Sequence, residues 1–150
     1  MSTEENKAIV RQLYEELYQK RNTAILDELI APEYVLRFAA AGWQPSVTRG
    51  PAVYREFMKV WWEALPDFSV GIEQLIAEGD SVVTVCTWSG THRGDLAYGP
   101  SGAIKPTGRR MSLPDIITSR ISEGQIVEEW ESANMGSLWQ QLGAIPSPAS

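Results

Sequence analysis

The chain has 150 residues, of which 43% are hydrophobic and 21% are charged, proportions that favour one globular domain and exclude a disordered chain. Its net charge of −6 argues against sequence-independent binding to nucleic acid, which needs a basic surface. The polar start MSTEENK has no apolar signal core, and no stretch reaches the roughly 18 apolar residues of a membrane span. We therefore expect a single cytoplasmic domain over residues 1–150 with neither a nucleic-acid nor a membrane partner.

The scarcity of metal-binding and nucleophilic residues argues against several kinds of active site. The chain has one cysteine, Cys86, and one histidine, His92, so neither an intramolecular disulfide nor a structural zinc site is expected. It contains no glycine-rich dinucleotide loop, no P-loop, and no HExxH or G-x-S-x-G motif. We expect no metal and no cofactor, and a buried, inert thiol at Cys86.

The first third of the chain shows the 3.6-residue period of helices. Ser2 and Glu5 form a capping-box pattern. The apolar stripe that follows consists of Val10, Leu13, Tyr14, Leu17 and Tyr18. A second, short helix is expected to end at Pro32. Its inward residues are Ile25, Leu26, Leu29 and Ile30. The segment EYVLRF is expected to be extended, and residues 39–49 to form a loop over the mouth of a pocket.

A third helix is expected to begin at Pro51, whose missing N–H costs nothing at a first helical position, and to end at Pro66. One face of this helix carries Val53, Phe57, Val60, Trp61 and Ala64.

Beyond Pro66 the period changes to two, which is typical of strands. Further strands are expected at residues 81–90, 109–121 and 126–132, with a loop at 97–108 and a last helix at 135–142. Helices followed by sequential strands predict an α+β fold, in which a curved antiparallel sheet and the N-terminal helices form a cone-shaped cavity, an α+β barrel. Six tryptophans favour a small apolar or aromatic substrate in that cavity.

Eight short segments follow one another in the order found in a known family. They are LYEELYQKRN, LDELIAPEYV, GPAVYREF, LPDFSVGIEQLIAEGDSVV, THRGDL, PTGRRMSL, SRISEGQIVEEW and LWQQLGA. Together they span about residues 5–144 and resemble the SnoaL-like polyketide cyclase family of the nuclear-transport-factor-like superfamily. The resemblance implies the cone fold and a cofactor-independent enzyme of secondary metabolism that closes an aromatic polyketide ring by an aldol step.

The resemblance also implies two catalytic positions, and this chain departs from the family pattern at both. The acid/base aspartate of the cyclases corresponds to Asn134, and their enolate-binding histidine corresponds to Ile117. Because asparagine cannot transfer a proton near neutral pH, we do not expect the standard residues to catalyse the standard reaction. Polyketide ring hydroxylases, isomerases and dehydratases of the same family are therefore alternatives to a cyclase.

Asp115 is the candidate that replaces the missing acid/base. Side chains two apart on a strand share a face, so an inward Ile117 implies an inward Asp115, where an ionised carboxylate is costly without a partner. The alternative is an aspartate exposed to water at a strand end. Counted from Asn134, the same alternation predicts that Trp130 and Ser132 face the pocket. It predicts the opposite face for Glu129 and Glu131.

The remaining site candidates each have a structural alternative. Asn134 either orients a substrate carbonyl or caps the following helix. His92 acts either as a base or as a loop anchor. Arg37 either binds a substrate carboxylate or phenolate or lies exposed at a strand edge. The expected stacking walls of the pocket are Phe57, Trp61 and Trp130.

Two non-enzymatic hypotheses stay open. A small-molecule-binding protein without turnover predicts that Asp115 is exposed or paired away from the cavity. An association module predicts a cavity filled by side chains and an apolar outer sheet face. A homo-oligomer, dimer or tetramer, fits any of these functions.

Overall fold

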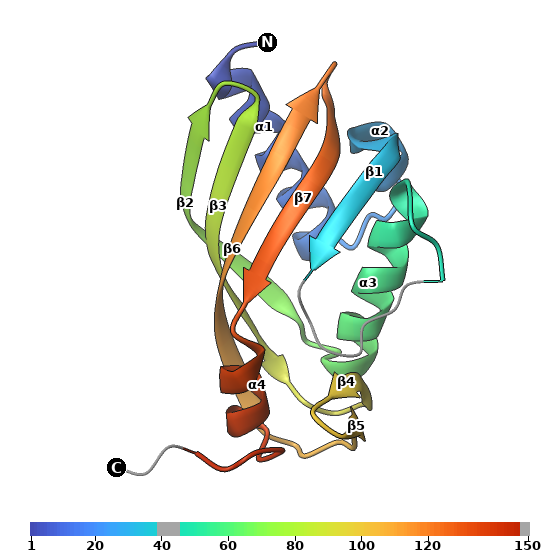
Figure 1. Ribbon diagram of the computed structural model, residues 1–150, viewed down its shortest axis with the longest axis vertical. Coiled ribbons are helices and arrows are strands. Elements are labelled where there is room, and N and C mark those ends of the chain that lie inside the picture. Colours follow the sequence, from blue (N-terminus) through green and yellow to red (C-terminus); the bar gives the residue numbers. More distant parts are fainter. Residues whose placement is uncertain (39–45, 148–150) are drawn as a thin grey trace.

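The computed structural model describes residues 1–38 and 46–147, which form helices packed on one face of a curved sheet (Figure 1). In chain order the elements are α1 (Thr3–Leu13), η1 (Tyr14–Gln19), α2 (Ile25–Leu29), β1 (Ile30–Phe38), α3 (Pro51–Ala64), β2 (Ser69–Glu78), β3 (Ser81–Thr91), β4 (Leu96–Gly99), β5 (Gly102–Ile104), β6 (Arg110–Ser122), β7 (Gln125–Ala133) and α4 (Met135–Gln141). None of the helices in these ranges is long and apolar enough to cross a membrane.

The N-terminal helix begins as the sequence predicts. Ser2 Oγ accepts from the Glu5 backbone N–H at 3.1 Å, and Glu5 Oε2 accepts from the Ser2 N–H at 2.6 Å. All five residues of the predicted apolar stripe are buried. From Tyr14 onward the helix is a π-helix, whose wider turn keeps the Tyr14 and Tyr18 rings 4.8 Å apart on the inner side.

The second and third predicted helices are present, with one change, and the last is α4. Helix α3 has Pro51 in its first turn after Gly50, and its inner face buries Phe57 and Trp61. Helix α2 ends at Leu29 because strand β1 begins at Ile30, so Pro32 lies within a strand and does not end the helix. An edge strand tolerates a proline, since part of its backbone has no ladder to join.

The main sheet has the order β1-β7-β6-β3-β2 (Figure 1). Strands β2, β3, β6 and β7 pair antiparallel, as predicted, but β1 pairs with β7 in parallel. The sheet is therefore mixed, and it does not close into a barrel, because β1 and β2 remain its two edges. The α+β class and the curved sheet are confirmed, and the pairing is mixed and not wholly antiparallel, because β1 joins β7 in parallel.

A two-stranded ribbon, β4 paired with β5, replaces the loop predicted at residues 97–108. Leu96 and Tyr98 on its inner face are 1% and 2% exposed, so the ribbon packs into the interior beside the end of α3 (Figure 1). The predicted pocket-covering loop at residues 39–49 lies mostly outside the described residues.

Candidate active site

Three carboxyl groups occupy the interior face of the sheet. Asp115 on β6 and Glu129 and Glu131 on β7 are 1%, 2% and 6% exposed. The prediction that Glu129 and Glu131 face away from the interior was therefore wrong. Strand β7 ends at Ala133, so Asn134 lies beyond the strand and its position does not fix the alternation within it.

Asp115 lies where the alternation on β6 places it. Ile117 is 4% exposed and shares the inward face with Asp115, while Ile116 between them is half exposed. The Ile116 backbone N–H donates to Asp115 Oδ1 at 2.9 Å. The alternative of a water-exposed aspartate at a strand end is thus contradicted by the burial of the side chain.

The side chains of Asp115 and Glu131 lie close enough for each to shift the pKa of the other, and we call them the carboxyl pair. Asp115 Oδ2 and Glu131 Oε1 have no hydrogen-bond partner within the described ranges. A bond between two carboxyl groups needs a proton on one of them. Burial raises the pKa of both groups, and for Glu131 the neighbouring Asp115 raises it further. Both shifts favour a proton on the pair, and that proton would let one carboxyl group donate to the other.

Glu129 is the third buried carboxyl group and has its own two donors. Tyr34 Oη donates to Glu129 Oε1 at 2.9 Å, and Ser119 Oγ donates to Oε2 at 2.6 Å. Burial raises the pKa of Glu129 to about 7, although both donors oppose the shift. No ion pair among the described residues includes Glu129 or either member of the carboxyl pair. In the same ranges, no group of three His, Cys, Asp or Glu side chains is arranged to hold a metal ion.

A group of aromatic side chains, which we call the aromatic wall, is buried in the same interior. Phe57 and Trp61 of α3 are buried in the interior, as predicted, and Trp61 contacts Trp88 of β3 and Tyr98 of the ribbon at ring-centroid distances of 5.0 and 5.5 Å. Phe38 of β1 contacts both Phe57 and Tyr98, at 5.2 and 6.2 Å. The interior therefore combines acid groups with flat apolar surfaces, a combination suited to an aromatic ligand that undergoes proton transfer.

Three predicted pocket residues lie on the opposite, outer face of the sheet. Trp130 is 44% exposed and Ser132 is exposed, because β7 turns Glu129 and Glu131 inward. Arg37 lies over the Trp130 ring at 5.7 Å and donates to Glu128 Oε1 at 2.6 Å. These residues line a hollow of about 500 Å³, whose lining also includes Phe38 and Glu131. Their assignment as inward-facing pocket residues is wrong.

The structure does not bring Asn134 or His92 to the carboxyl pair. Asn134 is exposed, and its Oδ1 accepts from the Ser137 backbone N–H at 3.0 Å, which is the helix-cap alternative. Cys86 is paired with Asp115, and His92 lies six residues further along the chain. About 20 Å of strand therefore separates His92 from the level of Asp115. Its Nδ1 accepts from the Thr107 backbone N–H at 3.2 Å, and burial lowers its pKa, so a neutral His92 anchors the base of the ribbon.

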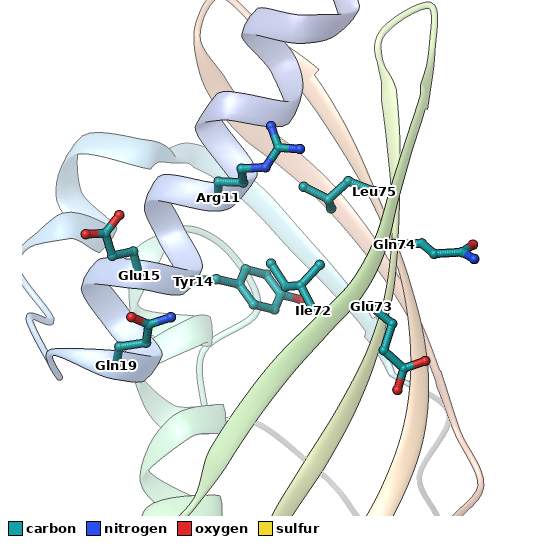
Figure 2. Close-up of a pocket in the computed structure, with 8 residues that line it drawn as sticks. All are labelled: Arg11, Tyr14, Glu15, Gln19, Ile72, Glu73, Gln74 and Leu75. Carbon is teal, nitrogen blue, oxygen red and sulfur yellow. The ribbon is translucent and has the colours of Figure 1, made fainter.

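A second hollow, of about 460 Å³, separates the N-terminal helix from edge strand β2 (Figure 2). Figure 2 shows Tyr14 pointing from the helix toward β2, with the side chain of Ile72 beside its ring. Glu73 and Gln74 point away from the helix. Tyr14 is only 3% exposed, so its ring separates this groove from the interior.

Comparisons with known proteins agree with this fold. The model of the SnoaL-like polyketide cyclase family matches residues 8–142. IdmH from Streptomyces antibioticus, described as a candidate polyketide cyclase, is 26% identical with a TM-score of 0.73, covering 92% of this chain and 98% of its own. TsrD from Streptomyces laurentii is 26% identical with a TM-score of 0.78, covering 97% and 99%.

AclR from Streptomyces galilaeus, described as a candidate hydroxylase, shares the fold at 23% identity, with a TM-score of 0.78 over 99% of this chain and 87% of its own. Among curated proteins, none matches. Because the family model covers most of the sequence, the chain belongs to the SnoaL-like polyketide cyclase family.

Proposed function

We propose that the protein is a cofactor-independent enzyme that transfers a proton at a carbon next to a carbonyl group of an aromatic polyketide or a similar polycyclic molecule. The observation that carries the proposal is the carboxyl pair, Asp115 and Glu131, two neighbouring acid groups buried in an interior that also holds the aromatic wall. Family membership supports the substrate class. Proton transfer near neutral pH requires a group whose pKa is close to the working pH, and burial raises the pKa of both carboxyl groups from their ordinary acidic values.

The pair supplies both groups that enolisation needs. The ionised member takes the proton from the substrate carbon, while the protonated member donates a hydrogen bond to an oxygen of the substrate. The C–H electron pair becomes the enolate, and both carboxyl groups are then protonated. In an aldol closure the enolate carbon attacks a second carbonyl, and one carboxyl proton passes to the new alkoxide. In an isomerisation the proton returns to a different carbon.

Hydrogen–deuterium exchange measures the first step without knowledge of the natural substrate. In D₂O, the protein is expected to accelerate exchange of the α-hydrogens of 2-tetralone and anthrone, followed by NMR, above the rate with an equal concentration of acetate. Tryptophan fluorescence establishes binding of the same ketones. Bound ketones that exchange no faster than in acetate would contradict the proposal and favour a binding protein. A product heavier by one oxygen would instead identify the hydroxylase alternative.

We also propose a homo-oligomer whose interface is the outer face of the sheet. One row of paired residues crosses all five strands there, and Ile76 and Trp130 in it are 54% and 44% exposed. The row consists of Ile76, Val83, Thr118, Trp130 and Arg37. Multi-angle light scattering is expected to give a multiple of 16.7 kDa for the wild type and a smaller assembly for Trp130→Glu. A wild-type monomer at micromolar concentration would overturn this proposal.

A further inference from the structure

We propose that Tyr14 and Tyr98 donate hydrogen bonds to two oxygen atoms of the substrate, one on each side of the carboxyl pair. This inference rests on the proposed function, because it takes the carbon that loses its proton to lie over Asp115 and Glu131. It adds to that function the two residues that bind the substrate oxygens and the chemical class of substrate that these two donors fit.

The five tyrosines of the chain are all buried, but only some of their hydroxyl groups have a hydrogen-bond partner among the described residues. The Tyr18 and Tyr54 hydroxyl groups are 2.8 Å apart, and Tyr34 donates to Glu129. The hydroxyl groups of Tyr14 and Tyr98 are buried with no hydrogen-bond partner in the part of the chain that the structure describes. A buried donor without a partner costs free energy, so a ligand oxygen is the natural acceptor for each.

Tyr14 reaches the pair from the helical layer. Its phenol end faces the thiol of Cys86, and Cys86 is the direct cross-strand neighbour of Asp115. The thiol donates weakly to the Asp115 backbone oxygen, with Sγ and O 3.8 Å apart. Burial raises the pKa of Tyr14 well above its usual value, so the phenol keeps its hydrogen and remains a donor.

Tyr98 reaches the pair from the ribbon, on the side of Glu131. Its ring contacts Phe38, and Phe38 is paired with Glu131 in the β1–β7 ladder. The indole N–H of Trp61 faces the Tyr98 oxygen, an orientation that leaves the phenol hydrogen directed elsewhere. Burial raises the pKa of Tyr98 as well, so it too is a donor at neutral pH.

Across the sheet, Cys86 is paired with Asp115 and Phe38 with Glu131, while Asp115 and Glu131 are diagonal neighbours, because the ladder pairs Asp115 with Ala133. Tyr14 lies on the Cys86 side of this group and Tyr98 on the Phe38 side. Two donors that flank an acid/base fit a substrate with an oxygen on each side of its reacting carbon, such as a 1,3-dicarbonyl compound or its enol. Proton abstraction leaves both carboxyl groups neutral and spreads the negative charge over these two oxygens. The phenols then stabilise the charge where it develops.

The test uses the variant Asp115→Asn with 1,3-dihydroxynaphthalene as a mimic of the enolate. The variant keeps the pair uncharged, which is the state that the pair reaches after it has taken the substrate proton. Absorbance distinguishes the bound anion from the neutral phenol. In this background, Tyr14→Phe and Tyr98→Phe are each expected to weaken binding of the anion by about 10- to 150-fold, the range for a hydrogen bond to a charged group. Tyr18→Phe is the matched control, since its hydroxyl is already engaged by Tyr54, and it should leave the affinity unchanged.

A second probe and a second measurement keep the test decisive. 2-Naphthol has only one oxygen, so the affinity of the protein for it should fall in only one of the two variants, Tyr14→Phe or Tyr98→Phe. If either variant is unfolded by circular dichroism, 3-fluorotyrosine-labelled protein replaces it, and ¹⁹F resonances of Tyr14 and Tyr98 should shift most with the dihydroxynaphthalene. Equal affinities in all three tyrosine variants, or equal ¹⁹F shifts for all five tyrosines, overturn the inference. If the phenols bind the probe but the wild type exchanges no α-hydrogen, the proton-transfer function fails while the donor assignment stands.

Discussion

Asp115→Asn and Glu131→Gln are each expected to slow α-hydrogen exchange of a bound ketone by about 10²–10⁴-fold, the usual effect of removing a positioned acid or base. Neither amide can accept the substrate proton near neutral pH, and each leaves only one titratable carboxyl in the interior pair. Folding should survive, because an amide can form a hydrogen bond with the remaining carboxyl group, accepting from its O–H through the amide oxygen or donating through the N–H₂. The measurement is the NMR exchange rate at saturating ketone, with fluorescence to show that binding persists.

Glu128→Gln is the matched control for this pair of variants. Glu128 lies on the same strand as Glu131, but it points to the outer face and pairs with Arg37 and Arg120. Its loss removes a carboxylate of the same kind without touching the interior, so the exchange rate should stay at the wild-type value. Wild-type rates in both Asp115→Asn and Glu131→Gln would assign the proton transfer to another group.

Glu129 makes the stability of the fold depend on pH. Burial raises its pKa from 4.5 to about 7, so the folded state binds more protons than the unfolded state between these values. Stability from this group is full below the unfolded pKa and is lost as the pH rises through the folded pKa. From about pH 5 to about pH 8, the free energy of unfolding should fall by about 2–3 kcal/mol on account of Glu129.

Urea unfolding at several pH values measures this loss. Glu129→Gln cannot ionise, so its stability should fall less over the same pH range than that of the wild type. The carboxyl pair contributes a loss of the same sign in both proteins, because its pKa values are also raised by burial. An equal pH dependence in wild type and variant would mean that Glu129 titrates at its ordinary value in the folded protein.

The helices and the inward Asp115 follow from local patterns in the sequence. The stripe around Tyr14 and the alternation between Asp115 and Ile117 each lie within one element, so spacing alone determines which residues share a face. The parallel pairing of β1 with β7 is different, because it joins segments nearly 100 residues apart and leaves no mark in either strand. The ribbon at Tyr98 is short and glycine-rich, and its sequence resembles that of a loop.

Glu129 and Glu131 were assigned to the wrong face for a specific reason. Between Ile126 and Glu128 the ladder with β6 shifts register, so alternation counted from Ile126 fails at that irregularity. Alternation counted from Asn134 fails as well, because Asn134 caps α4 beyond the end of the strand. The three glutamates within EEWE indicate an unusual strand, but only the partner strands determine which two of them face the interior.

Carbon-13 NMR of the side-chain carboxyl groups tests the shared proton most directly. With Asp and Glu labelled at the carboxyl carbon, Asp115 and Glu131 are assigned from the Asn and Gln variants and followed as the pH is raised. A coupled titration is expected, with one proton held between the two groups at neutral pH and released only above it. Two independent titrations near the ordinary values of 3.8 and 4.5, with both groups ionised at neutral pH, would contradict the proposed acid/base pair.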